Sequence, residues 1–207
     1  MDTGEKLLYR RVSEIEKRPY DWVWEPYIPG GHITLLEGDP GIGKTMLLGQ
    51  LSKMVTRGLS DPRATDPSCA PGNVIWFSSE DDPSTTIRGR LEVAGADLER
   101  VVWFDGIERG SSVDPIIFLD NQLYHFENLV RELKPKLIFF DPITMYMGTK
   151  VDIYRTNEVQ PILFRLDRLA KKYGFGVIAI RHLTKNNEKR GMMSGQGSIA
   201  FTGPSRS

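Results

Sequence analysis

A glycine-rich octapeptide near the start of the chain constrains the fold more than any other feature of the sequence. It has the spacing G-x-x-x-x-G-K-[ST] and consists of Gly38, Asp39, Pro40, Gly41, Ile42, Gly43, Lys44 and Thr45. The glycines let the backbone turn tightly and approach a phosphate that a Cβ atom would keep away. Backbone amides and the following helix start then bind the anion, Lys44 reaches its outer phosphates, and the Thr45 hydroxyl binds Mg²⁺. The octapeptide therefore predicts a site for a nucleoside triphosphate.

The segments on both sides of the octapeptide are those that such a loop requires. Residues 33–37 form a short apolar run of β-prone residues, and residues 46–55 have the composition of a helix. Strand, loop and helix in this order are the setting in which the motif binds phosphate. We therefore interpret the octapeptide as functional and not as an incidental glycine-rich turn.

Strands and helices alternate along the rest of the chain. The apolar patterns predict further strands at 73–78, 101–104, 137–140 and 175–180, helices at 84–94, 121–133 and 156–173, and loops at 105–115 and 147–155. This alternation predicts an α/β fold with a mostly parallel sheet flanked by helices on both faces. We expect residues 1–32 to be a prefix that wraps the core, with Trp22 and Trp24 as packing residues, and residues 33–207 to be the core itself.

Composition narrows the classes of protein that the chain can belong to. Lysine plus arginine equals aspartate plus glutamate at 27 each, so a globally basic nucleic-acid binder is not indicated, although a local basic loop remains open. The single cysteine, Cys69, excludes a disulfide framework and a cysteine-based zinc site. No apolar run reaches the roughly 18 residues that a membrane span needs. With a polar N-terminus as well, we expect a soluble cytoplasmic protein without a membrane partner.

Polar residues follow several of the predicted strands, at the edge where open α/β sheets bind ligands. Asp141 follows the apolar run 137–140 and is a candidate to position Mg²⁺ opposite Thr45; the alternative is a capping aspartate before Pro142. Glu80 follows the strand at 73–78 and is a candidate general base for an attacking water.

Two features at these strand ends allow other interpretations. Asp81 and Asp82 are alternative bases, or they cap the next helix. His182, which follows the last strand, is a candidate sensor of the γ-phosphate, and the alternative is a purely structural histidine.

Taken together, these stretches resemble the RecA-like P-loop ATPases. The nearest group is the AAA-type family that includes the RepA-like replicative helicases of plasmids and related phage and mobile-element ATPases. The match is carried by the octapeptide and by residues 78–83, 138–142, 181–185, 197–201 and 205–207, in that order.

The resemblance implies a core in which the strand ending at His182 lies between the loop strand and the strand of Asp141. It implies ATP with Mg²⁺ at the interfaces of a homo-oligomeric ring, usually a hexamer. Glu80 would be the catalytic base, Asp141 the Walker B acid, His182 the sensor, and Arg206 an arginine finger that reaches a neighbour's ATP. Because the family core normally continues beyond the finger segment, we expect residues 33–207 to be truncated at the C-terminal end.

A basic loop would connect such a ring to DNA. Lys185, Lys189 and Arg190 would face the ring channel and touch the phosphates of single-stranded DNA; the alternative is a solvated charged loop. The leading hypothesis is thus an ATPase coupled to DNA, of the replicative or mobile-element helicase type. The alternative is a non-motor RecA-like regulatory ATPase that acts on protein partners. A small-molecule kinase is disfavoured because only Arg88 and Arg90 could form a basic lid, and a GTPase because no Asn-Lys-x-Asp motif is present.

Overall fold

A parallel sheet forms the centre of the computed structural model, which describes residues 8–17, 19, 21–114 and 116–182. Its strands have the order β3-β9-β8-β4-β5, and every neighbouring pair is parallel. The strands are β3 (Ile33–Gly38), β4 (Asn73–Ser78), β5 (Val101–Trp103), β8 (Pro135–Asp141) and β9 (Gly176–His182). This order confirms the predicted parallel sheet and the position of the strand ending at His182 between the loop strand and the strand of Asp141.

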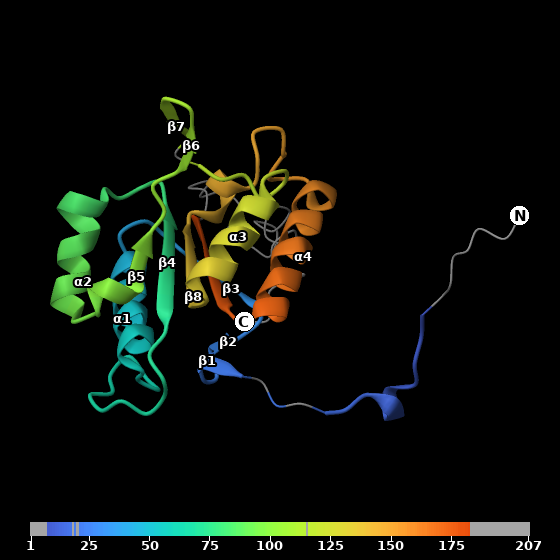
Figure 1. Cartoon of the computed structure of the whole chain (residues 1–207), viewed down its shortest axis with the longest axis horizontal. Helices are drawn as coiled ribbons and strands as arrows, with labels where there is room; N and C mark the ends of the chain where they lie inside the picture. The colour runs from blue at the N-terminus through green and yellow to red at the C-terminus, as the bar shows by residue number, and fades with distance from the viewer. Residues whose placement is uncertain (1–7, 18, 20, 115, 183–207) are drawn as a thin grey trace, which may run out of the picture.

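Helices cover both faces of the sheet, as the alternation of elements predicts (Figure 1). Helices α1 (Lys44–Arg57) and α2 (Arg88–Ala94) pack on one face, and α3 (Leu123–Leu133) and α4 (Thr156–Tyr173) pack on the other. Within β8, Leu137 and Phe139 pack in the core beneath α1 and α2, whereas Ile138 and Phe140 pack in the core beneath α3 and α4. A strand buried on both faces is apolar throughout, which explains the uninterrupted run that precedes Asp141. No helix in the described part of the chain is long and apolar enough to cross a membrane.

Aromatic packing holds the first helix firmly against the sheet. The Trp76 indole, 1% exposed, donates a hydrogen bond from Nε1 to Ser52 Oγ on α1 at 3.1 Å. Its ring meets Phe139 edge to face, with centroids 5.0 Å apart. A buried indole N–H needs such a partner, so this contact fixes α1, and with it the loop that precedes α1, relative to β4.

The prediction of a loop at 105–115 is wrong for most of residues 105–114, which the structure describes. Strands β6 (Ile107–Arg109) and β7 (Ser112–Asp114) form an antiparallel hairpin closed at Gly110, which has φ +63°. These strands have three residues each and are mostly polar and exposed, so no alternating pattern reveals them. The hairpin projects from the sheet at the end opposite β1 and β2 (Figure 1).

The segment before the core forms a second hairpin, of β1 (Trp22–Trp24) and β2 (Ile28–Pro29). Gly31 N donates to the carbonyl of Phe175 at 3.0 Å, just before β9, and Ile28 is 2% exposed in the core shared by α1 and α2. Trp24 packs against the same core, as expected for a packing residue. The hairpin therefore lies beneath the amino ends of the strands, away from their carboxyl ends.

Single helical turns complete the fold. They are η1 (Val12–Glu14), the π-helical turn η2 (Pro83–Ile87) that leads into α2, η3 (Leu98–Arg100) and η4 (Ile143–Tyr146). The predicted helix at 84–94 thus begins one residue earlier, with Pro83 in its first position.

Candidate active site

The octapeptide spans the turn between β3 and α1. Gly41 and Gly43 have φ values of +83° and +94°, in the left-handed region that favours glycine. A Cβ atom on either residue would meet no atom of the described chain within 4 Å, so the space beside them is open. Gly43 also has no side chain to cap α1, which leaves the amides of its first turn available to an anion.

The Lys44 side chain folds back over this loop. Its ammonium group donates to the carbonyl oxygens of Gly38 at 2.9 Å and Asp39 at 3.0 Å, and the residue is only 8% exposed. An ammonium group has three donors, so these two bonds leave one for a further acceptor. The ammonium charge is therefore held at the loop by the loop's own carbonyl groups.

Asp141 and Glu80 lie at the same edge of the sheet because their strands are parallel neighbours. Asp141 pairs in register with Ser78, the last residue of β4, and Ser79 N donates to the Asp141 carbonyl at 3.1 Å. Asp141 is 2% exposed, whereas Glu80 is exposed two residues beyond the end of its strand. One carboxylate is thus enclosed by the fold and the other lies in reach of solvent.

The charge of Asp141 acts on a neighbouring phenol. Burial raises the pKa of Tyr146 above its ordinary value, and the negative charge of Asp141 raises it further. Tyr146 follows Asp141 in η4 and packs edge to face on Phe140, with centroids 5.3 Å apart. The phenol therefore stays neutral beside the carboxylate.

Asp81 and Asp82 both have structural partners. Asp82 caps the next helical turn, accepting hydrogen bonds from the backbone N–H groups of Ser84 at 2.9 Å and Thr85 at 2.8 Å. Hydrogen bonds from Ser84 and Thr85 lower the pKa of Asp82 to about 2. Asp81 forms an ion pair with Arg90 at 2.7 Å. The capping interpretation of Asp82 is confirmed, and Arg90 is engaged with Asp81 in this arrangement.

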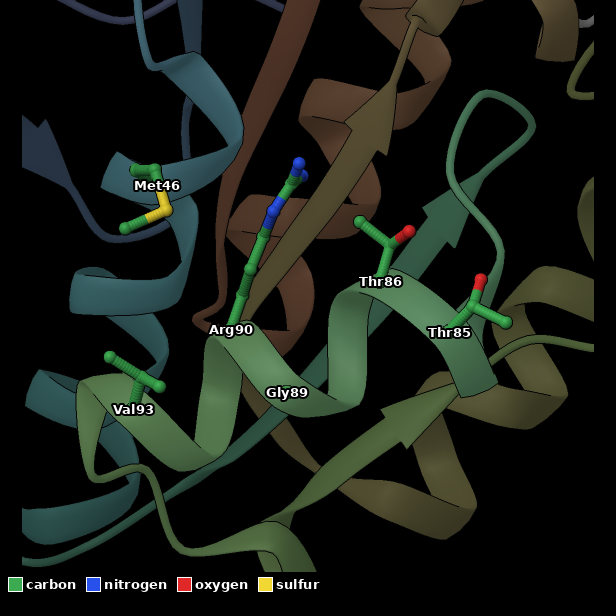
Figure 2. A pocket seen from close by; sticks show the side chains of 6 residues that line it. All are labelled: Met46, Thr85, Thr86, Gly89, Arg90 and Val93. Atoms are coloured by element: carbon green, nitrogen blue, oxygen red, sulfur yellow. The ribbon is translucent and has the colours of Figure 1, made fainter.

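An open pocket lies beside the start of α1, between α1 and α2. It has a volume of about 350 Å³ and is lined by Met46, Thr85, Thr86, Gly89, Arg90 and Val93. In the view of Figure 2, Arg90 rises from α2 between Met46 and Thr86. No residue pattern in the sequence indicates this pocket, because it depends on the packing of two helices. These helices approach each other at Gly49, where an added Cβ atom would lie 3.8 Å from the Ala94 Cβ.

A second feature was missed by sequence reasoning. Glu37 and Arg181 form an ion pair across β3 and β9, directly before Gly38 and His182. The sequence does show a charged residue at the end of each of these two apolar strands. The pairing of strands so far apart in the chain, however, cannot be predicted from either segment alone.

The structure describes only part of the remaining predicted residues. The backbone of His182 pairs in register with Gly38, so β9 ends beside the loop. The His182 side chain and all of Lys185, Lys189, Arg190 and Arg206 lie outside the described residues. Their predicted roles, like that of Glu80, stay predictions.

Comparison with known families matches residues 5–188 to a family of AAA domains. The chain belongs to this AAA domain family. This AAA domain is also similar to the DNA repair protein RadA of Streptococcus pneumoniae (strain ATCC BAA-255 / R6), with 21% identity over 201 residues. The match covers 91% of the chain but 41% of RadA, so the chain spans less than half the length of that relative. The family match, the phosphate loop and the strand order together identify a RecA-like P-loop ATPase domain.

Proposed function

We propose that this AAA domain binds ATP with Mg²⁺ and hydrolyses it in a cycle coupled to single-stranded DNA, as a replicative or mobile-element helicase would. The observation that carries the hydrolytic part is the convergence of three elements at one sheet edge. These are the loop of Gly41 and Gly43, the buried carboxylate of Asp141 and the exposed carboxylate of Glu80.

The phosphate loop and Lys44 hold the triphosphate. The left-handed glycines let the backbone amides approach the phosphates, and the third N–H of the Lys44 ammonium group donates to their oxygens. This binding places charge and donors around the transferred group before reaction, which is the main contribution that such sites make to catalysis.

The oxygen ligands present fit a magnesium ion. Mg²⁺ usually takes one or two protein oxygens together with substrate phosphates and waters, not an all-protein cage. The described residues contain no cluster of three histidine, cysteine or acidic side chains that could form such a cage. The Thr45 hydroxyl and the Asp141 carboxylate would hold the ion, which when bound neutralises charge on the β- and γ-phosphates.

Glu80 is proposed as the base that orients and deprotonates the attacking water. Its exposure after β4 suits contact with water, and Asp82 serves as the cap of the next helical turn. His182, at the end of β9, is proposed to sense the γ-phosphate, because its backbone adjoins the first residue of the loop.

The pocket between α1 and α2 is proposed to receive the nucleoside. It lies beside Met46, which directly follows Thr45, the proposed magnesium ligand. Its apolar side chains suit the faces of a base, and the Arg90 guanidinium offers a planar cation that can stack on it. A volume of about 350 Å³ falls within the usual range for ligand sites.

Two observations support coupling to DNA: the similarity to RadA, and three basic residues that follow β9 in the sequence. RadA is named a DNA repair protein, and its similarity extends over 91% of this chain. Lys185, Lys189 and Arg190 follow β9 in the sequence, within eight residues of His182, its last residue. We propose that they contact DNA phosphates within a ring of identical subunits, without reading the base sequence.

The test of DNA coupling is ATP hydrolysis with and without single-stranded DNA at several salt concentrations. We expect DNA to stimulate turnover, and the triple variant Lys185→Ala, Lys189→Ala, Arg190→Ala to lose the stimulation while keeping its basal rate. Turnover that is indifferent to DNA would contradict the coupling and favour a regulatory ATPase acting on protein partners.

Arg206 is proposed to complete the site of a neighbouring subunit. Arg206→Ala subunits would then retain an intact phosphate loop, and Lys44→Ala subunits an intact finger. Mixing the two inactive variants should restore part of the hydrolysis, because some interfaces combine both intact halves. A mixture that stays inactive while forming the same oligomer would contradict a finger that acts in trans.

A further inference from the structure

An ion pair joins the phosphate-loop strand to the neighbouring strand at their last positions. Glu37 on β3 and Arg181 on β9 are partners in the parallel register, and their carboxylate and guanidinium groups are in contact. The Arg181 side chain is 11% exposed and the Glu37 side chain 28%. The next register position joins Gly38, which opens the phosphate loop, to His182.

The burial of the pair gives it a stronger effect than a surface ion pair. Leu35 and Ala179, two residues earlier on the same strands, face the core beneath α3 and α4. Because side chains alternate along a strand, Glu37 and Arg181 share that face, opposite the one covered by α1. A charge so enclosed is costly without its counter-ion, so each side chain constrains the other.

The constraint extends from Glu37 into the phosphate loop. Glu37 is followed directly by Gly38, whose carbonyl accepts a hydrogen bond from the Lys44 ammonium at 2.9 Å. The Asp39 carbonyl accepts the second bond at 3.0 Å. The described contacts therefore form a continuous path from the end of β9, through Arg181 and Glu37, to the cation that binds the phosphates.

We propose that the Glu37–Arg181 ion pair is a positioning device that couples the end of β9 to the phosphate loop. The inference rests on the proposed function and concerns the regulation of that same site. Movement at the end of β9 shifts Arg181, then the Gly38 carbonyl, and so the Lys44 ammonium. By reciprocity, a γ-phosphate bound at Lys44 biases the end of β9. Neither side chain is proposed to touch the nucleotide.

The test compares charge-removing and charge-exchanging variants. For Glu37→Gln and Arg181→Gln, we expect kcat for ATP hydrolysis to fall about tenfold or more, because small displacements of catalytic groups are costly. We expect KM for ATP and Kd for ADP to stay within about threefold, since the loop still binds the β-phosphate. The exchanged pair, Glu37→Arg with Arg181→Glu, should recover part of kcat, and Arg181→Lys, which keeps the charge, should be intermediate.

Glu127 provides a matched control at a distance from the site. Its carboxylate, 25% exposed, accepts from Lys172 Nζ on α4 at 2.8 Å, so it resembles Glu37 in exposure and in having a cationic partner. Glu127→Gln should lower the melting temperature without changing kcat. A merely structural role for Glu37 would give the same pattern in Glu37→Gln.

Two results would overturn the inference. One is wild-type kcat in folded Arg181→Gln or Arg181→Lys; the other is no recovery of kcat in an exchanged pair that folds. These outcomes are distinct from failure of the proposed function. If the wild type does not hydrolyse ATP, or Lys44→Ala hydrolyses it normally, the proposed function is wrong and the inference falls with it. If Lys44→Ala is inactive but Arg181→Gln turns over normally, only the coupling is wrong.

Discussion

Replacing Gly43 with alanine separates the conformational role of this glycine from its role in binding. Gly43 has φ +94° and ψ 19°, and a Cβ atom there would meet no described protein atom within 4 Å. The whole loss of stability should then come from the backbone conformation, which costs an L-residue about 1–2 kcal/mol. For a domain of this length, each kcal/mol lowers the melting temperature by about 2–4 °C.

Nucleotide binding should suffer more than stability. The added methyl group occupies the space through which the backbone approaches a phosphate, so at least one amide loses its anion. A hydrogen bond to a charged group contributes about 1.5–3 kcal/mol, so affinity for ATP should fall by roughly tenfold to a hundredfold.

Gly174, at the end of α4, is a close control. It has φ +76° and ψ 19°, and its Cβ would also meet no described atom within 4 Å. Thermal unfolding should show similar losses for Gly43→Ala and Gly174→Ala, whereas calorimetric titration with ATP should show weaker binding for Gly43→Ala alone. Wild-type ATP affinity in Gly43→Ala, or an equal loss in Gly174→Ala, would refute the reasoning.

Three further predictions concern the residues around the loop. Glu80→Gln should keep ATP affinity and lose about 10²- to 10⁴-fold in turnover; unchanged turnover would move the base to Asp81 or Asp82. Because the pKa of Asp82 is lowered to about 2 from 3.8, its cap should stabilise the fold fully above pH 3.8 and weaken as the pH falls toward 2. Melting temperatures of Asp82→Asn, which keeps an acceptor oxygen, should depend less on pH across that range, and an identical acid profile would contradict the capping role. Arg90→Ala should weaken ATP binding by about 0.5–2 kcal/mol through lost stacking on the base and leave inorganic triphosphate binding unchanged; an equal loss for both ligands would contradict a nucleoside pocket.

Long apolar patterns made much of the fold predictable. The helix predicted at 156–173 is confirmed as α4, Thr156–Tyr173, because its amphipathic period extends over eighteen residues. The uninterrupted apolar run before Asp141 predicted a buried strand. In the structure this strand is β8, and helices cover both of its faces. The β6–β7 hairpin was not predicted, since its short polar strands gain no burial that would mark the sequence.

The parts of the candidate site that depend on the spacing of nearby residues in the sequence were predictable. The phosphate loop needs its glycines and Lys44 at fixed spacing, and Asp141 directly follows the apolar run 137–140. The Glu37–Arg181 ion pair depends instead on the pairing of β3 with β9, which only the folded sheet brings together. The pocket beside Met46 likewise depends on the packing of α2 against α1.

The most direct test of the central claim is calorimetric titration of the chain with ATP in the presence of Mg²⁺, for wild type and Lys44→Ala. The Lys44 ammonium is held at the loop by the carbonyls of Gly38 and Asp39, and we propose that it provides the main cationic contact to the phosphates. We predict saturable binding of one ATP per wild-type chain and a loss of at least about tenfold in affinity for Lys44→Ala. Equal affinity in a folded Lys44→Ala variant, or no binding by wild type, would contradict the account.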